Sequence, residues 1–526
     1  MRAALGRNVL ANLINVAASI GASLVSLPII LDRIGTAGYG VWTIALTFIV
    51  YLAGAEAGVG PAAQRWASVS HGGGEEAGIR RVLWTSLALY ALIGVVVAAV
   101  MAVAAPGIVN LFNFPARFHD DAVVMFRIVG AVMALILVGT ALANVLQGTQ
   151  RFAPTALTSA LGSGVYLAAI LVFLQGPDPL IVLALAAAAQ QVVTVAGRGL
   201  ALRRLFAAGA PIFLHRHEIR QLLGFSVRLQ VGVLSGLINS QSDKIVVGLV
   251  SSTRTLGQLG IATQFADAGR LVAGAALIPI NASLAVAVGA EDHERLVREF
   301  TWVHRIWQIT MIGATLIGLG ALYPLTAGWL GPGHAQAVVL GSFLIAGTGF
   351  SMLTGAGAGY LRAVGRPGLE GKVGVVVVAL NLVLTIPLAL AFGAIGVVAG
   401  TFGAYVCGVF WFMGRFWSAA PDLPRPSTRT FVKPVLLALV ISALVEAVGV
   451  ASIELLPRGL SLVPTVTAFL AGLALYMAAA TGTPLRVQSF KDLARSLTPA
   501  ALNRRQGEGA PASDETTAGA SDTART

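Results

Sequence analysis

Eight ionisable residues lie inside long apolar stretches of this sequence. They are Glu56, Arg127, Arg228, Asp243, Lys244, Asp267, Arg270 and Glu446. A charged side chain in the middle of a bilayer costs at least about 2.5–3.5 kcal/mol on insertion scales, so such residues usually face the interior of a helix bundle and mark ligand or ion pathways. These residues are therefore the first candidates for a functional site.

The two signs of charge suit different ligands. A guanidinium stays protonated and presents planar, bidentate donors, which suits an anionic group of the phosphate type. The candidates for binding such a substrate are Arg127, Arg228 and Arg270. A carboxylate inside a membrane can exchange protons or bind sodium. The candidates for ion coupling are Glu56, Asp243 and Asp267.

A purely structural interpretation stays open for some of these charges. Asp267 and Arg270 are three residues apart, so they can neutralise each other on one helix face. Arg228 and Asp243 are fifteen residues apart, about 22 Å along a helix, and cannot pair within it. For Lys244 we expect the long side chain to reach toward the membrane interface.

Amide and hydroxyl side chains form a second pattern at helical spacing. In the first apolar stretch the polar residues share one helix side: Asn8, Asn12, Asn15, Ser19 and Ser26. The stripe indicates either polar packing between helices or the lining of a cavity. We take Asn12 and Asn15, together with Asn239 in a later stretch, as candidate substrate-binding residues.

The elements that position these residues are predicted to be membrane-spanning helices. The chain has 526 residues, of which 56% are hydrophobic and 11% charged, unlike any soluble class. The apolar stretches have the length of membrane spans. They cover residues 8–31, 39–60, 82–108, 122–147, 154–174, 179–199, 221–250, 257–288, 303–329, 336–361, 373–391, 395–414, 434–450 and 461–481. The predicted fold is an all-α, multi-pass membrane protein with about fourteen helices, twelve being the alternative.

The distribution of positive charge predicts the orientation. Segments on the side of the N-terminus hold 26 of the 35 lysines and arginines, and segments on the other side hold 4. Because cytoplasmic loops are rich in these residues, both termini are expected in the cytoplasm of a bacterial inner membrane. The same spread along short loops, instead of along one face, argues against nucleic acid as a partner.

Two pairs of segments indicate an internal duplication. Residues 146–151 resemble residues 361–366 at an offset of 215, and residues 38–43 resemble residues 258–263 at an offset of 220. Both offsets place six helices in each half, so the halves have parallel topology around a central site. The predicted parts are a first lobe (1–200), a basic linker (201–220), a second lobe (221–417), a helix pair (418–485) and a partly disordered tail (486–526).

Catalytic and cofactor motifs are not found. No cluster has the spacing of metal ligands, no phosphate-binding loop of the Gly-x-x-x-x-Gly-Lys type occurs, and Cys407 is the single cysteine. The chain is therefore expected to be no enzyme and to need no cofactor, so transport would be driven by a gradient. A membrane polymerase or ligase would be expected to carry a long outer loop with catalytic residues.

Several segments resemble one family of transporters. Residues 8–28, 33–42 and 56–65 resemble the opening of Wzx-type polysaccharide and oligosaccharide flippases. Residues 146–151, 243–248 and 365–396 are similar to later parts of the same family, which belongs to the superfamily of MATE exporters and lipid II flippases.

The resemblance implies two six-helix lobes that open alternately to either side and move a polyprenyl-pyrophosphate-linked oligosaccharide between leaflets. It also implies protons or sodium as a coupling ion and other membrane proteins of polysaccharide assembly as partners. The open alternatives are a MATE-like antiporter for cations or drugs and a lipid II flippase. The small excess of cations over anions inside the predicted helices favours an anionic cargo.

Overall fold

The computed structural model describes residues 2–54, 59–213, 234–289, 293–366 and 368–481, and most of these are helical. Ten of the described helices are long and apolar enough to cross a membrane. The predicted class, an all-α multi-pass membrane protein, is confirmed. The helices of the first half are α1 (Arg2–Gly54), α2 (Val59–Gly72), α3 (Glu76–Leu111), α4 (His119–Gly148), α5 (Phe152–Phe173), α6 (Pro179–Ala201) and α7 (Arg203–Ala207).

The second half begins with an unlabelled helical segment, residues 234–250. It continues with α9 (Thr253–Gly289), α10 (His293–Leu330), α11 (Ala335–Met352), α12 (Gly355–Ala363), α13 (Gly368–Ala419), α14 (Arg429–Leu455) and α15 (Leu462–Thr481). Short 3-10 turns at Ala116–Phe118 and Pro332–His334 precede α4 and α11. The predicted span 336–361 is divided by a turn at residues 353–354, which separates α11 from α12.

Two long helices each contain a sharp reversal at one glycine. Gly35 in α1 has φ 67° and Gly393 in α13 has φ 58°, a left-handed region that favours glycine. Each reversal converts one continuous helix into two antiparallel spans. Counting these halves separately, each of the fourteen predicted ranges contains a described helix, although only 234–250 of the seventh range is described, whereas α2 and α7 lie almost wholly between predicted ranges.

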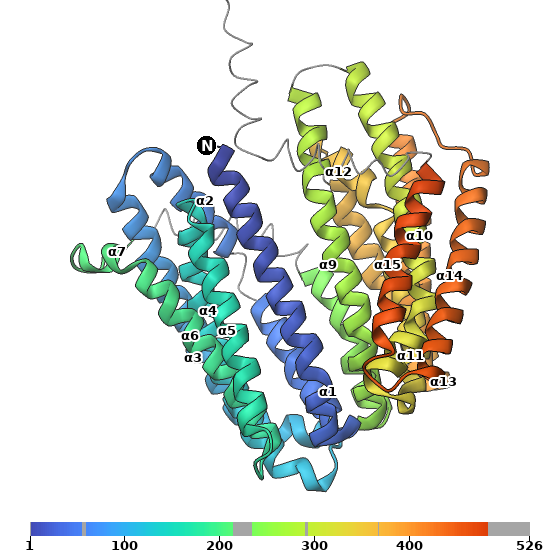
Figure 1. Cartoon of the computed structure of the whole chain (residues 1–526). Coiled ribbons are helices and arrows are strands. Elements are labelled where there is room, and N and C mark those ends of the chain that lie inside the picture. The colour runs from blue at the N-terminus through green and yellow to red at the C-terminus, as the bar shows by residue number, and fades with distance from the viewer. Residues whose placement is uncertain (1, 55–58, 214–233, 290–292, 367, 482–526) are drawn as a thin grey trace, which may run out of the picture.

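The helices form two groups (Figure 1). In the first group α3 packs on α4, α5 on α6, and α1 on α5. In the second group α11 packs on α9 and α13, while α14 and α15 cover α10. The two groups approach each other at the lower end of the view, where α1 meets α9, and lie farther apart at the upper end.

The backbone confirms the similarity of residues 146–151 and 361–366. Gln150 has φ 59° and Gly365 has φ 74°, and both follow the end of a helix. Arg151 N–H donates to the carbonyl of Leu146 at 2.7 Å, and the same bond joins residues 366 and 361 at 2.7 Å. This six-residue bond is typical of a Schellman helix end. Both segments therefore have the same local fold, at the predicted offset of 215.

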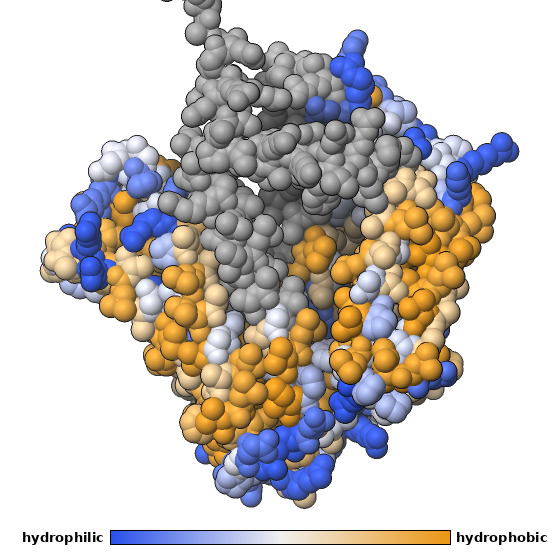
Figure 2. All heavy atoms as spheres, in the orientation of Figure 1, coloured by the Kyte–Doolittle hydropathy of each residue, from blue (hydrophilic) through white to orange (hydrophobic). Residues whose placement is uncertain are grey.

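The outer surface is that of a protein surrounded by lipid. Apolar residues cover its sides, and hydrophilic residues gather toward the two ends (Figure 2). Large aliphatic side chains on these sides are strongly exposed, including Val103 at 84% and Leu390 at 78%. Exposed apolar area on this scale is costly in water and is favourable against hydrocarbon chains. The chain is thus a multi-pass membrane protein.

The two ends of the bundle are named here by their loops. The kink end holds Gly35, Gly331 and Gly393, and the basic end holds the turns at residues 73–75, 149–151 and 420–428. Successive spans alternate between these ends. The described lysines and arginines in loops and helix termini concentrate at the basic end, whereas the kink end holds Arg33, Arg117, Arg254 and Arg458.

Candidate functional site

The two lobes meet in a tight seam at the kink end, formed by Thr36, Gly40 and Thr43 of α1 with Thr253, Gly257 and Gly260 of α9. A Cβ atom placed on Gly40 would lie 2.0 Å from the Thr253 carbonyl oxygen, and one on Gly257 would lie 2.0 Å from the Thr36 carbonyl oxygen. Only glycine permits so close an approach of two helix backbones. The seam therefore closes the kink end between the lobes.

Ion pairing adds little to this closure. Asp32 of α1 and Arg458 of the α14–α15 turn lie 4.0 Å apart, with side chains 71% and 51% exposed. An exposed pair at this distance contributes at most about 1 kcal/mol. Backbone packing at the glycines, instead of charge, holds the seam closed.

Asp243 lies in a buried polar network between segment 234–250 and α13. Its side chain is 4% exposed, and its Oδ1 accepts a hydrogen bond of 2.7 Å from the Thr401 hydroxyl. Asn381 Nδ2 contacts the same hydroxyl at 2.9 Å and donates to Asn239 Oδ1 at 3.3 Å. Thr385 donates to Asn381 Oδ1 at 3.2 Å. Carboxylate, amide and hydroxyl groups of two elements are thus joined in one hydrogen-bonded network.

The prediction for Lys244 is wrong. Instead of reaching an interface, the side chain is buried at 8% exposure, and its ammonium donates to Gln241 Oε1 at 2.9 Å. Asp243, Asp267 and Arg270 all interact electrostatically with Lys244. The attraction to these two carboxylates and the hydrogen bond to Gln241 offset part of the cost of burying the ammonium.

Asp267 and Arg270 form the ion pair that their spacing predicts. Arg270 Nη1 lies 3.4 Å from Asp267 Oδ1, and Arg270 Nη2 lies 3.5 Å from the Thr348 hydroxyl of α11. Both contacts are long for charge-assisted hydrogen bonds, which are usually 2.7–2.9 Å. The side chains are 35% and 47% exposed for Arg270 and Asp267, so the guanidinium has donors free for a further ligand.

The described structure says less about the other predicted site residues. Arg127 is exposed on α4, between Phe126 and Ile128. Asn12 and Asn15 belong to α1, but their side chains lie outside the described part of the chain. Glu56 and Arg228 lie outside the described residues. Among the predicted candidates, the described structure therefore brings together Asn239 and Asp243 in one network and Asp267 with Arg270 in an ion pair.

The predicted site includes Asn12, Asn15 and Asn239 but lacks other neutral polar residues within the spans. Asn381 and Thr401 complete the environment of Asp243, and Gln264 of α9 bonds to Ser23 of α1 at 3.1 Å across the two lobes. The sequence does carry a signal for them. An amide inside an apolar span requires a hydrogen-bond partner, just as a charge does, although the cost of leaving it unpaired is lower.

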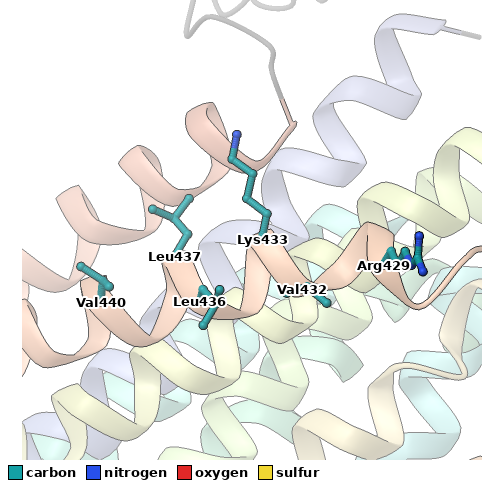
Figure 3. A pocket seen from close by; sticks show the side chains of 6 residues that line it. All are labelled: Arg429, Val432, Lys433, Leu436, Leu437 and Val440. Atoms are coloured by element: carbon teal, nitrogen blue, oxygen red, sulfur yellow. The ribbon is translucent and has the colours of Figure 1, made fainter.

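A groove on α14 lies apart from these residues. It has a volume of about 640 Å³ and is lined by Arg429 and Lys433 near the start of the helix and by Val432, Leu436, Leu437 and Val440 further along (Figure 3). The two cations are at the basic end and the apolar side chains continue into the span. This order matches the passage from lipid headgroups to hydrocarbon, as expected for a lipid-facing side of a membrane-spanning helix.

Solved structures of transporters share this fold. The chain is 13% identical to "Lipid II flippase MurJ, inward closed conformation", with TM-score 0.66 over 90% of this chain and 98% of that one. It is 16% identical to an inward-facing multidrug resistance MATE transporter, with TM-score 0.63 over 78% and 99%. A transporter of the same superfamily from Pyrococcus furiosus is 16% identical, with TM-score 0.54 over 80% and 97%.

The sequence itself carries the family assignment. Among curated proteins no relative matches the chain. The family described as "Polysaccharide biosynthesis protein" matches residues 5–283, more than half of the sequence. That range includes α1, α9 up to its last turns, and both Asp243 and Arg270. The chain therefore belongs to the family described as "Polysaccharide biosynthesis protein", and its fold is that of the MATE transporters and the lipid II flippase.

Proposed function

We propose that this chain flips a polyprenyl-pyrophosphate-linked oligosaccharide across the bacterial cytoplasmic membrane by alternating access, for a cell-surface polysaccharide such as the O-antigen of lipopolysaccharide. The family match supports a role in polysaccharide synthesis, and the fold supports transport. The observation that carries the proposal concerns Arg270, a cation beside the lobe interface. Both contacts of its guanidinium, to Asp267 and to Thr348, are long.

Arg270 has the chemistry that a pyrophosphate requires. Its guanidinium is part-buried, so the attraction to a phosphate oxygen is screened less than at a fully exposed site. The contact with Asp267 orients the guanidinium of Arg270 but leaves some of its N–H donors unused. A pyrophosphate that replaces these long contacts gains two short, charge-assisted hydrogen bonds. Arg228 and Arg127 remain proposed as further residues for the same anionic group.

The proposed direction follows from charge. The basic end is assigned to the cytoplasm, together with both termini, because positive residues concentrate there. With this orientation the closed seam faces outward and the substrate enters from the cytoplasmic side. Reopening the seam while the basic end closes would release the oligosaccharide outside.

Ion coupling is assigned to the Asp243 network. Sodium prefers oxygen ligands, and the Asp243 carboxylate and the Thr401 hydroxyl are hydrogen-bonded to each other, while the Asn381 amide presents its N–H donor to the hydroxyl. Proton uptake by the same carboxylate would also change the charge of the network. Either ion would bias the packing of segment 234–250 against α13, which is how a gradient can drive alternation.

A MATE-like exchange of cationic solutes has less support. It needs a carboxylate that is accessible and unpaired. Within the described part of the chain, Asp267 is paired with Arg270, and Asp243 is buried and hydrogen-bonded. A lipid II flippase shares the chemistry of the proposed substrate and differs in the sugar, so the substrate has to be varied in the assay.

Flipping by Arg270 variants in proteoliposomes tests the proposal. Purified protein is reconstituted with a fluorescent lipid-linked oligosaccharide, and its appearance in the opposite leaflet is measured by membrane-impermeant quenching. Arg270→Ala is expected to abolish flipping, and Arg270→Lys, which keeps the charge but loses the fork, to weaken it. Arg298→Ala, in an exposed pair with Glu294, serves as the control. Normal flipping by Arg270→Ala would refute the role, and efflux of a cationic dye without flipping would favour the antiporter.

A further inference from the structure

A small pocket lies in the first lobe, next to the seam. Its volume is about 280 Å³, and its walls come from α1, α4, α5 and α6, with one side chain, Gln264, contributed by α9 of the second lobe. This volume is near the lower end of the range for small-molecule sites. The pocket is therefore sized for one small ring and not for a whole oligosaccharide.

The lining of the pocket is uncharged and combines apolar side chains with hydroxyl and amide groups. Among its described lining residues there is no Asp, Glu, Lys, Arg or His. The polar groups are hydroxyls, amides and one indole, supplied by Ser23, Ser26, Ser163, Tyr39, Tyr166, Trp42, Gln190, Gln191 and Gln264. A charged ligand would lose its hydration here without gaining a counter-charge. The pocket therefore favours a neutral ligand with several hydroxyl or amide groups.

Two of these amides have unused hydrogen-bonding capacity. The side chains of Gln190 and Gln191, adjacent in α6, are half-buried and make no hydrogen bond to another described residue. Each carboxamide offers two donors and one acceptor oxygen with two lone pairs. Such groups in the middle of a membrane span are costly unless a partner satisfies them. A polyhydroxylated ligand in the pocket would supply those partners.

The remaining walls suit the faces of a sugar ring. Tyr166 of α5 is half-buried at the pocket, and its aromatic surface can lie against the C–H face of a pyranose. Other polar groups of the pocket are held in place by hydrogen bonds within the protein. Gln264 accepts from Ser23 at 3.1 Å and donates to the Tyr39 hydroxyl at 3.4 Å. Amides around an aromatic surface are a typical arrangement for holding a neutral sugar.

We infer that this first-lobe pocket is a recognition subsite for one uncharged sugar unit of the lipid-linked substrate, held by Gln190 and Gln191 and stacked on Tyr166. The inference rests on the proposed function and specifies the substrate class. Because Gln264 belongs to the second lobe and bonds to Ser23, opening of the seam would also change this pocket. Sugar occupancy and lobe movement are therefore coupled.

Binding of two probes tests the inference. The probes are undecaprenyl pyrophosphate carrying one N-acetylglucosamine and undecaprenyl pyrophosphate without sugar, and the full-length protein in detergent is titrated with each. Gln190→Leu and Gln191→Leu are each expected to weaken binding of the sugar-bearing probe about three- to tenfold, the range of one or two neutral hydrogen bonds. Binding of the sugar-free probe should not change.

The controls separate this inference from the proposed function. Gln147→Leu, in α4 outside the pocket, should bind both probes like the wild type. Ala187→Leu fills the pocket without removing a polar group, and is expected to weaken only the sugar-bearing probe. The subsite alone is overturned if the glutamine variants, at unchanged melting temperature, bind both probes like the wild type. It is also overturned if they lose affinity equally for both probes. If the wild type binds neither probe, the proposed function fails, and the subsite fails with it.

Discussion

Substituting alanine for Gly40 or Gly257 is predicted to force the seam open. A Cβ atom on either residue would be 2.0 Å from a backbone carbonyl oxygen of the other helix. Ordinary carbon–oxygen contacts are about 3.3–3.6 Å, so α1 and α9 would have to separate locally by about 1.4 Å. The obstacle is main chain, so no side-chain rotation relieves it, and truncating Thr253 would not rescue the variant.

The expected size of the effect follows from overpacking. Inserting a methyl group into a packed contact typically costs about 1–3 kcal/mol. If this cost is paid only in the closed state, the equilibrium between closed and open seam shifts by about 5- to 150-fold. The glycine variants are therefore expected to populate the open state far more than the wild type, without unfolding.

Thiol labelling measures this shift. Thr43 is 3% exposed in the seam, so a Thr43→Cys probe in a Cys407→Ser background should react slowly with an impermeant maleimide added at the kink end. Gly40→Ala or Gly257→Ala should accelerate labelling, by up to the factor above. Gly21→Ala on α1 and Gly269→Ala on α9 are matched controls, because an added Cβ meets nothing within 4 Å there. Equal labelling of glycine variants and controls would refute the reasoning.

Three further predictions concern coupling, the helix pair and topology. Asp243→Asn is expected to remove the dependence of flipping on a sodium or proton gradient. Thr401→Val, which loses one hydrogen bond to the carboxylate, is expected only to weaken that dependence. An unchanged gradient dependence in both variants would exclude the network as the coupling site. Tyr476→Ala should destabilise docking of α15 by about 3–5 kcal/mol, because the ring is fully buried and its hydroxyl donates to the Ile309 carbonyl at 2.9 Å. Limited proteolysis of α15 would detect this, and resistance equal to the wild type would contradict it. Reporter fusions at Pro177 should report the outside and fusions at Leu214 the cytoplasm; an outside signal at Leu214 would be incompatible with the duplicated lobes.

The spans of this protein are determined by local composition. About twenty consecutive apolar residues form a helix in lipid whatever the rest of the chain does, because every backbone group must be satisfied within the segment. The likeness of residues 146–151 and 361–366 is also readable in the sequence, and residues 150 and 365 share a positive φ and the same helix-end bond. The spacing of Asp267 and Arg270 predicted their ion pair, since residues three apart share one helix face.

Contacts between distant segments required the tertiary structure. Lys244 was expected at an interface, and it is buried beside Gln241, where the Asp267 carboxylate from another helix offsets part of the cost of burying its charge. The Thr401 hydroxyl bonds to Asp243, which lies 158 residues earlier in the chain, and no local sequence pattern predicts that contact. Likewise, Gly40 and Gly257 look like two ordinary glycines in a chain with 61 of them. They close the kink end only because α1 and α9 cross there, since glycine is needed where two helix backbones meet.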